Sequence, residues 1–425
     1  MKSMIKFIHT ADIHLDSPLK GLEAHEDAPV AEIRGATRRA FDNLIDLAVE
    51  EEVDFLLIAG DLYDGDWKDY NTGLFFAARM GRLARAGIKV FIVSGNHDAA
   101  SQITRSMPLP ENVTLFSSRK PQSVRLDDLG VVIHGQSYST RAVTENLAAG
   151  YPPSEAGYCN IGLLHSSLTG RAGHEDYAPC TVDDLKSKGY DYWALGHVHQ
   201  REIVAVDPWI VFPGNLQGRH IKESGIKGAT LVTIEDGRIV DVAECRLDVL
   251  RWALCRVDLS SCETVESVYD AVRRGFDREQ DLADGKTLAV RLILTGKCPV
   301  HNRLLDRTAK WTEELRGIAV GQVDLWLEKV LFQTSREVSL EEILDEDTPI
   351  ARLLQSIAGL EMDGDTLIGL VPELAVLKSK LPHELHSDEE PLLDLLDPMP
   401  DKTAALRSAV QELLIAKLLH HGGGR

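Results

Sequence analysis

The chain lacks long apolar runs, closely spaced cysteine pairs and an excess of basic residues, and each absence argues against a class of protein. No apolar run reaches the roughly 18 residues that would span a bilayer, and the six cysteines form no C-x-x-C pair. Cysteines scattered in this way argue against a zinc cluster and against a dense disulfide framework. Basic residues are in the minority, because 46 Lys and Arg stand against 66 Asp and Glu, which gives a formal net charge of −20. This balance argues against tight, metal-independent binding to nucleic acid by the chain alone, although bound divalent cations would offset carboxylates locally.

Aromatic residues make up only 6% of the 425 residues, and they are too scattered to predict a surface on which bases stack. The N-terminal apolar stretch that ends at Ile8 is too short for a signal peptide, and no small-residue cleavage site follows it. We therefore expect this stretch to form the first strand of a cytoplasmic protein that does not enter a membrane. The length of the chain allows two or three domains.

Short apolar runs alternate with helical patterns from residue 1 to about residue 244. This alternation predicts a layered α/β domain, a β-sandwich flanked by helices, with strands that are buried on both faces. We expect strands at 5–8, 53–58, 90–93, 131–133, 161–164 and 192–195, and helices at 31–52 and 73–86. Three further runs predict consecutive antiparallel strands that complete the domain, at 210–212, 229–234 and 239–243.

The rest of the chain changes character twice. Residues 245–334 predict a small α+β domain, with strands at 254–259, 288–294 and 323–332 and helices at 265–276 and 303–315. Residues 335–425 are acidic and contain many prolines, and they predict a helical C-terminal region. Ser339 and Glu342 form a capping box there. A leucine-rich helix over 402–419 would either dock a partner or pack on its own domain.

Five short motifs carry most of the chemical information, and each of them follows an apolar run. They are Asp12-Ile13-His14, Gly60 to Asp64, Gly95 to Asp98, Gly162 to His165 and Gly196 to His199. Layered α/β folds gather ligands at the carboxyl ends of their strands, so we expect one edge of the fold to hold all five. Carboxylate, imidazole and amide oxygen without thiolate suit divalent ions such as Mn²⁺, Fe²⁺ or Zn²⁺.

The spacing within the motifs adds geometry. Asp12 and His14 are two residues apart, so on an extended segment both side chains would leave the same face, as would His197 and His199. Asp61 is the central candidate, because one carboxylate can bridge two ions. Two metals roughly 3.5–4 Å apart would clamp a phosphate and activate a water molecule for in-line attack.

In order and spacing the motifs resemble those of the calcineurin-like metallophosphoesterase superfamily, over residues 1–244. Within it the chain is most similar to SbcD-type bacterial DNA exonucleases, through its opening Phe7 to Leu15 and its Pro213 to His220 segment. The extended form of the second segment is most similar to the YhaO branch. Phosphoprotein phosphatases carry Arg and Glu where this chain has Gly65 and Asp98.

The resemblance implies a role for each motif residue. One metal ion would be held by Asp12, His14, Asp61 and His199, and the second by Asp61, Asn96, His165 and His197. The ions would be Mn²⁺, with Fe²⁺, Zn²⁺ or Mg²⁺ as alternatives. His97 would be the general acid or would stabilise the phosphate, and Asp98 would orient its imidazole. Asp64 would lie behind the metals. Arg219 and His220 are candidates for a phosphate contact, and Arg219 is equally suited to pair with an acidic neighbour.

The function implied by the resemblance is a metal-dependent DNA nuclease, a 3′-to-5′ exonuclease with or without endonuclease activity. It would act in DNA repair with an SMC-like coiled-coil ATPase, and the small domain would cap the site and position DNA. A homodimer through helices of the first domain is also implied. A phosphodiesterase for small molecules, such as cyclic nucleotides, would use the same two metals, and the acidic charge favours it slightly. A scaffold without catalysis is disfavoured, because none of the seven ligands is missing.

Overall fold

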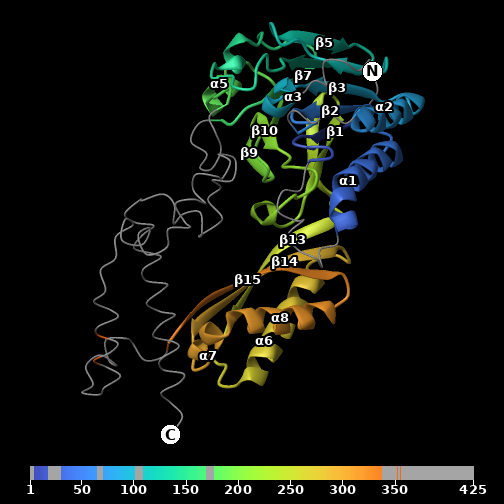
Figure 1. Cartoon of the computed structure of the whole chain (residues 1–425). Helices are drawn as coiled ribbons and strands as arrows, with labels where there is room; N and C mark the ends of the chain where they lie inside the picture. The colour runs from blue at the N-terminus through green and yellow to red at the C-terminus, as the bar shows by residue number, and fades with distance from the viewer. Residues whose placement is uncertain are drawn as a thin grey trace, which may run out of the picture. The chain divides into compact units, whose positions relative to one another are not determined.

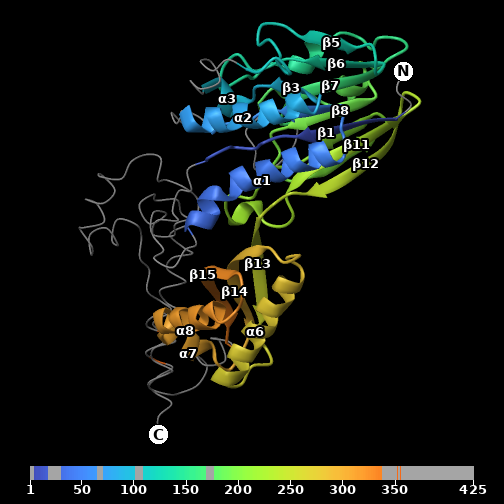
Figure 2. The same cartoon turned by 90° about the vertical axis from the view of Figure 1, so that its right-hand side faces the viewer.

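The computed structural model describes residues 4–17, 30–64, 70–100, 109–168 and 177–336, together with residues 352 and 355. The chain divides into two compact units, which are described separately (Figures 1 and 2). The first unit comprises Met1–Leu254, Gln280–Val290 and Asp324–Glu328, and the second comprises Cys255–Glu279, Arg291–Val323 and Lys329–Arg425.

One six-stranded sheet of the first unit has the order β12-β11-β1-β2-β3-β4. Its first four strands in the chain run parallel to one another: β1 (Met4–Thr10), β2 (Phe55–Ala59), β3 (Lys89–Val93) and β4 (Val113–Leu115). An antiparallel hairpin continues the sheet beside β1, formed by β11 (Gly228–Glu235) and β12 (Arg238–Arg246). Two helices cover one face of this sheet, α1 (Val30–Glu50) and α2 (Tyr70–Arg85) (Figure 2).

The second sheet of this unit has the order β5-β6-β7-β8-β10-β9. Its four central strands are parallel: β6 (Val131–Gly135), β7 (Cys159–His165), β8 (Tyr192–Gly196) and β10 (Trp209–Phe212). Antiparallel strands form both edges, β5 (Gln122–Leu126) and β9 (Glu202–Val206). A short helix, α5 (Val182–Lys186), precedes β8 and begins with the capping box of Thr181.

The main core of the first unit lies between the two sheets. Phe7 of β1 stacks on Phe55 of β2, with ring centroids 4.9 Å apart, and meets the ring of Tyr192 from β8 edge-on at 5.4 Å. These rings pack with buried residues of both sheets, among them Leu57 and Ile161. A second core lies between the first sheet and helices α1 and α2. Helices outside and sheets inside confirm the predicted layered α/β sandwich.

Of the three strands predicted to be consecutive and antiparallel, the first belongs to a different sheet from the other two. The strands at 229–234 and 239–243 form the expected hairpin, but residues 210–212 lie in β10, which is parallel to β8 in the other sheet. On its other side β10 pairs antiparallel with β9, a strand that was not predicted. Residues 203–206 of β9 are a short apolar run, and Ile203 and Val206 are exposed at this edge of the sheet.

A three-stranded sheet follows, with the order β13-β14-β15. Its strands are β13 (Leu250–Asp258), β14 (Thr287–Lys297) and β15 (Leu325–Ser335), and its helices are α6 (Val265–Asp281), α7 (His301–Asp306) and α8 (Thr308–Val320). The predicted helix at 303–315 is therefore two helices, which meet at Arg307 with a φ of −138° and a ψ of 46°. In the second unit the hydroxyl of Tyr269 on α6 donates to Glu314 on α8.

The predicted capping box at Ser339 and the leucine-rich helix at 402–419 lie outside the described residues. Within the described part of the chain, none of the helices combines the length and the apolar character that crossing a membrane requires.

Candidate metal centre

The five motifs come together where the two sheets of the first unit present the carboxyl ends of their parallel strands. Asp12, Asp61 and Asn96 follow β1, β2 and β3 of one sheet, whereas His165 ends β7 and His197 follows β8 of the other. The backbone N–H of His197 donates to both carboxylate oxygens of Asp12, at 3.1 and 2.9 Å, so the two sheets are hydrogen-bonded to each other at this edge.

The backbone of the ligand segments is not extended, contrary to what the two-residue spacing suggested. Asp12, His14, Asp61 and His197 have positive φ values of 50°, 45°, 51° and 104°. This conformation costs a residue other than glycine roughly 1–3 kcal/mol, and it persists only where its surroundings impose it. Here the N–H groups of Asp12 and His14 donate to the carbonyls of Gly60 and Asp61, both at 3.0 Å. These hydrogen bonds hold the segment after β1 beside the segment after β2, so that their predicted ligands lie next to one another.

At two motif positions only glycine fits, because a neighbouring side chain lies close to the backbone. A Cβ on Gly60, whose φ is +91°, would lie 2.4 Å from Nδ1 of His165. A Cβ on Gly95 would lie 2.3 Å from Oδ1 of Asp61. The glycines therefore leave the space that the neighbouring side chains occupy.

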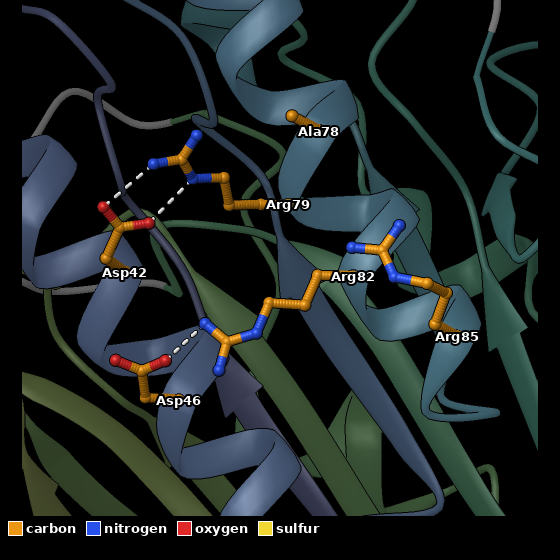
Figure 3. Close-up of a pocket in the computed structure, with 6 residues that line it drawn as sticks. All are labelled: Asp42, Asp46, Ala78, Arg79, Arg82 and Arg85. Carbon is orange, nitrogen blue, oxygen red and sulfur yellow. Dashed lines mark hydrogen bonds and ion pairs between the residues drawn. The ribbon is translucent and has the colours of Figure 1, made fainter.

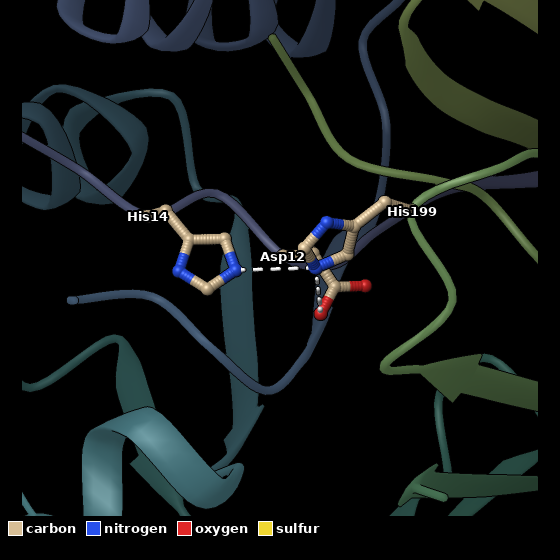
Figure 4. A group of neighbouring side chains, drawn as sticks. All are labelled: Asp12, His14 and His199. Atoms are coloured by element: carbon tan, nitrogen blue, oxygen red, sulfur yellow. Dashed lines mark hydrogen bonds and ion pairs between the residues drawn. The ribbon is translucent and has the colours of Figure 1, made fainter. Parts of the chain in front are cut away.

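One group of potential ligands comprises Asp12, His14 and His199, whose ligand atoms all lie within 4.8 Å of one another (Figure 4). Nε2 of His14 lies 3.3 Å from Nε2 of His199, and Nε2 of His199 lies 3.8 Å from Oδ1 of Asp12. Asp12 and His14 are buried, whereas a quarter of the His199 side chain is exposed. Two imidazole nitrogens and a carboxylate that converge in this way suit a divalent ion.

A second group comprises Asp12, Asp61 and His165, again with ligand atoms within 4.8 Å of one another. Nε2 of His165 lies 3.5 Å from Oδ2 of Asp61 and 3.0 Å from Oδ1 of Asn96. Nδ1 of His165 contacts the carbonyl of Ala59 at 2.9 Å, so that Nδ1 is the donor and Nε2 keeps its lone pair.

The two groups share Asp12, and Asp61 lies close to the histidines of both. Oδ2 of Asp61 lies 3.9 Å from Nε2 of His14 as well as 3.5 Å from Nε2 of His165, a position that suits a bridging carboxylate. The ring of His197 packs edge-on against that of His165, with centroids 5.2 Å apart. The structure thus brings all seven predicted ligands into one cluster.

The electrostatics of the cluster fit bound cations. Burial and the neighbouring charge of Asp61 raise the pKa of Asp12 well above its ordinary value. Burial lowers the pKa of His14 and that of His165, which keeps both imidazoles neutral and able to ligate. Among the described residues, Nδ1 of His14 has no hydrogen-bond partner. Two buried carboxylates that repel each other, surrounded by neutral imidazoles, are compensated when divalent ions bind.

His97 lies at the start of α3 (Asn96–Ala100), with 31% of its side chain exposed. Its Nδ1 lies 2.8 Å from Oδ1 of Asp64, and its backbone N–H donates to Oδ1 of Asp61 at 2.9 Å. Burial favours the neutral ring. The hydrogen bond with Asp64 and the charges of Asp61 and Asp64 outweigh burial, and the pKa of His97 is raised above its ordinary value. The raised pKa favours the protonated ring, which suits the predicted role of His97 as an acid.

Asp64, and not Asp98, orients His97, which corrects the assignment made from the sequence. Asp98 is buried and accepts hydrogen bonds from the backbone N–H groups of Leu62, Tyr63 and Gly95, at 3.2, 2.9 and 3.1 Å. Because it lies in the first turn of a helix, its carboxylate ties two loops together instead of reaching the ring. Burial and the charge of Asp61 raise the pKa of Asp98 to about 7.

Asp64 is ionised in its surroundings. Burial tends to raise its pKa, but hydrogen bonds from His97 and Ser17 and the charge of Arg219 lower it to about 2. Its Oδ1 also lies 3.8 Å from Nδ1 of His14. Asp64 therefore lies behind the predicted ligands, where the sequence placed it, and contacts both His14 and His97.

Arg219 pairs with acidic neighbours, one of the two alternatives that the sequence left open. Its Nη2 donates to Oε1 of Glu223 at 2.7 Å, and its Nη1 lies 3.8 Å from Oδ2 of Asp64. The His220 side chain is half exposed and lies 3.6 Å from Oε1 of Glu223. A phosphate contact for Arg219 or His220 stays a prediction.

Glu223 is a site residue to which sequence reasoning gave no role. It is buried, and its Oε1 lies 2.7 Å from Nδ1 of His199. Burial would raise its pKa, but the hydrogen bond from His199 and the charge of Arg219 hold that pKa far below its ordinary value. The four-residue spacing of Arg219 and Glu223, in the Pro213 to Glu223 segment that follows the last ligand motif, is the signal that could have revealed it.

A separate pocket lies between α1 and α2, away from the motifs. It is lined by Asp42, Asp46, Ala78, Arg79, Arg82 and Arg85 (Figure 3). Arg79 donates to both carboxylate oxygens of Asp42, at 2.7 and 3.1 Å, and Arg82 pairs with Asp46. These ion pairs link the two helices, and the pocket contains none of the predicted site residues.

Comparison with known proteins agrees with the motifs. A family model described as calcineurin-like phosphoesterase matches residues 5–201, and one described as metallophosphoesterase YhaO, middle domain, matches residues 252–335. The chain is 39% identical to an uncharacterized metallophosphoesterase YhaO of Bacillus subtilis (strain 168) over 303 residues, which cover 70% of this chain and 74% of the relative. The chain belongs to the YhaO-type metallophosphoesterases. It is thus a phosphoester-hydrolysing enzyme of a family that uses divalent metal ions.

This YhaO-type enzyme has more distant relatives as well. It is 26% identical to the DNA double-strand break repair protein Mre11 of Sulfurisphaera tokodaii over 316 residues, which cover 71% of this chain and 76% of that protein. The crystal structure of TT1561 of Thermus thermophilus aligns with a TM-score of 0.33 and 12% identity, over 57% of this chain and 99% of that one. So low a TM-score carries no inference.

Proposed function

We propose that this metallophosphoesterase is a DNA nuclease that hydrolyses phosphodiester bonds at DNA ends, from 3′ to 5′. The observation that carries the proposal is the partly exposed His97–Asp64 pair, whose His97 ring packs against that of the predicted ligand His14. The ester oxygen that leaves from a DNA phosphodiester needs a proton, and a histidine with a raised pKa supplies one. The 26% identity to an Mre11 protein over most of the chain supports DNA as the substrate.

Seven side chains would hold the two ions: Asp12, His14, Asp61, Asn96, His165, His197 and His199, with Asp61 shared. When bound, the ions would offset the charge of the phosphate and would lower the pKa of a water molecule. We propose Mn²⁺ as the native ion, with Fe²⁺, Zn²⁺ and Mg²⁺ as alternatives that the same donor set accepts.

The remaining chemistry belongs to the protein. Asp64 holds Nδ1 of His97, so that the other ring nitrogen delivers its proton to the leaving oxygen. The backbone N–H of His97 donates to Asp61, and this hydrogen bond fixes the ring relative to the predicted bridging carboxylate. Both interactions act before substrate arrives, so the proton donor is already in place.

Three further proposals concern assembly and DNA. The chain works in DNA repair with an SMC-like coiled-coil ATPase, which offsets the unfavourable net charge of −20 by bringing DNA to the site. The α+β region at 245–334 caps the site and positions DNA. Two copies of the chain form a homodimer through helices of the first unit.

The test is hydrolysis of 3′- and 5′-end-labelled duplex DNA by the purified chain in Mn²⁺, with a small aromatic phosphodiester in parallel. Asp61→Ala removes the predicted bridging ligand, and Asp270→Ala, on the exposed surface of α6, is the matched control. Shortening from the 3′ end that survives Asp270→Ala and disappears in Asp61→Ala supports the nuclease.

The acidic charge favours a second candidate, a phosphodiesterase for small molecules such as cyclic nucleotides. Turnover of a cyclic nucleotide while single-stranded and duplex DNA stay intact, with and without a coiled-coil ATPase added, would replace the nuclease by this alternative. Hydrolysis of DNA in preference to the small ester would exclude it.

A further inference from the structure

The imidazole of His199 is held at both of its ring nitrogens. Nε2 faces the ligand group, 3.3 Å from Nε2 of His14 and 3.8 Å from Oδ1 of Asp12. Nδ1 lies 2.7 Å from Oε1 of Glu223, and an ionised carboxylate can only accept a hydrogen bond. Nδ1 of His199 therefore carries the proton, and Nε2 presents a lone pair to the position where an ion would bind.

The carboxylate of Glu223 is itself fixed from several directions. Its side chain is 4% exposed. Oε1 accepts from the guanidinium of Arg219 at 2.7 Å, in addition to His199. Oε2 accepts from Nδ2 of Asn215 at 2.9 Å and from the backbone N–H of Arg219 at 2.8 Å. A buried carboxylate whose two oxygens are both occupied in this way has one orientation, and it passes that orientation to the ring it holds.

The same segment also fixes the backbone of His199. The ammonium group of Lys227, which is almost completely buried, donates to the carbonyl of His199 at 2.7 Å, and the N–H of Asn215 donates to it at 3.3 Å. Residues 215–227 thus hold both the ring and the main chain of His199. They supply no predicted ligand themselves.

The other predicted ligands are supported differently. Nδ1 of His165 donates to a neutral acceptor, the carbonyl of Ala59, at 2.9 Å. Nδ1 of His14 lies 3.8 Å from Oδ1 of Asp64, too far for a hydrogen bond. Of these three histidines, only His199 is held by a buried carboxylate, so its support can be removed without touching the other two.

We propose that Glu223 is the positioning residue of His199 and that it sets the affinity of the metal site formed with Asp12 and His14. A carboxylate behind a ligating histidine fixes the ring and makes its free nitrogen a stronger donor, and changing such a partner typically costs roughly 10–100-fold in metal affinity. This inference rests on the metal ligands of the proposed function and is independent of DNA as the substrate.

The experiment is a Mn²⁺ titration of the metal-free full chain, followed by the electron paramagnetic resonance signal of unbound Mn²⁺. Wild type is expected to bind two ions. Glu223→Gln keeps the size of the side chain and removes its charge, and we expect one of the two sites to weaken by roughly 10–100-fold while the other is unchanged. Glu223→Asp should recover part of the loss. Glu235→Gln, at the exposed end of β11, is the matched control and should leave both sites unchanged.

A second measurement reports on the ring directly. Nitrogen-15 NMR of histidine side chains in the metal-free protein should show His199 with its proton on Nδ1 in wild type and a mixture of tautomers in Glu223→Gln. Both Mn²⁺ affinities unchanged in a folded Glu223→Gln protein would overturn the inference. If that variant does not fold, a wild-type His199 with its proton on Nε2 overturns it equally. Wild type that binds no Mn²⁺ would instead refute the metal site of the proposed function.

Discussion

Two arginine–carboxylate pairs with the same chemistry lie in different surroundings. Arg219 donates to Glu223 at 2.7 Å beside the metal centre, and the two side chains are 14% and 4% exposed. Arg79 donates to Asp42 at 2.7 Å in the pocket between α1 and α2, where the side chains are 31% and 38% exposed. The distances are equal, but water screens only the second pair. Burial, and not the geometry of the pair, therefore decides what its loss would do.

The reason is the cost of leaving one charge alone. When one partner of a buried pair is removed, the other stays in a medium of low dielectric without compensation, which typically costs roughly 3–5 kcal/mol. An exposed partner is solvated at once and loses little. The charged groups beside the predicted ligands are buried, so each depends on its partner. The ion pairs of the described surface are exposed, so water replaces a lost partner.

The largest effect is expected inside the buried cluster. In Asp61→Ala the predicted bridging carboxylate is lost, so hydrolysis should fall to the level of metal-free protein. The loss should exceed the roughly 10–100-fold expected for an outer partner such as Glu223. Phosphodiester hydrolysis and Mn²⁺ stoichiometry, measured on the same preparation, check this. A variant that keeps two ions and full activity would remove Asp61 from the site.

The next effect concerns the proton donor. His97→Ala should lower kcat by roughly 10²–10⁴-fold, the usual contribution of general acid–base catalysis. Both Mn²⁺ affinities should stay within a factor of a few, because His97 is not among the predicted ligands. Single-turnover kinetics with metal titration separate the two quantities, and a parallel loss of metal would make His97 a ligand instead.

The comparison of the two pairs is tested by matched substitutions. Arg219→Met leaves Glu223 buried without its main counter-charge, and we expect a loss of roughly 3–5 kcal/mol in the free energy of unfolding. Urea unfolding of the metal-free protein measures it. A loss below that of an exposed pair would show that His199 and Asn215 alone stabilise the carboxylate.

The pH dependence distinguishes Asp64 from Asp98. His97 donates a proton, so activity should fall as the pH rises through its pKa, which Asp64 raises. In Asp64→Asn this support is lost, the pKa of His97 falls, and the decline in kcat should begin at a lower pH. Asp98→Asn should leave the position of the decline unchanged, because Asp98 bonds to backbone N–H groups. A shift in the second variant and none in the first would restore the assignment made from the sequence.

The smallest effect is expected at the exposed pair. Arg79→Met should change the free energy of unfolding by no more than roughly 1 kcal/mol, since exposed ion pairs are worth little. The same urea experiment applies. A loss equal to that of Arg219→Met would mean that the pocket between α1 and α2 is structurally as important as the buried pair.

Much of the first unit could be predicted from the sequence. Strands buried on both faces are continuous apolar runs, so residues 53–58 gave β2 and residues 161–164 gave β7 within two residues. The rule that ligands gather at the carboxyl ends of parallel strands then placed five motifs on one edge. The edge strand β9 was not predicted, although its residues 203–206 form a short apolar run.

What could not be predicted depends on contacts across the fold. Asp98 is next to His97 in sequence, but Asp64 reaches the ring because the loop after β2 passes beside α3. Glu223 contacts His199 only once residues 215–227 fold back over the last motif. The positive φ of Asp12 arises from hydrogen bonds to the neighbouring loop, which no local pattern encodes.

The ligand cluster draws on both sheets of the sandwich: Asp12, Asp61 and Asn96 come from one, and His165 and His197 from the other. An ion bound between these residues would add a cross-link between two layers that already pack through apolar side chains and share the hydrogen bonds from His197 to Asp12. The affinity for metal ions would then depend on how the two six-stranded sheets are aligned. A substitution in the core between the sheets, far from any predicted ligand, would then lower the affinity for metal ions before it changed the surface of the protein.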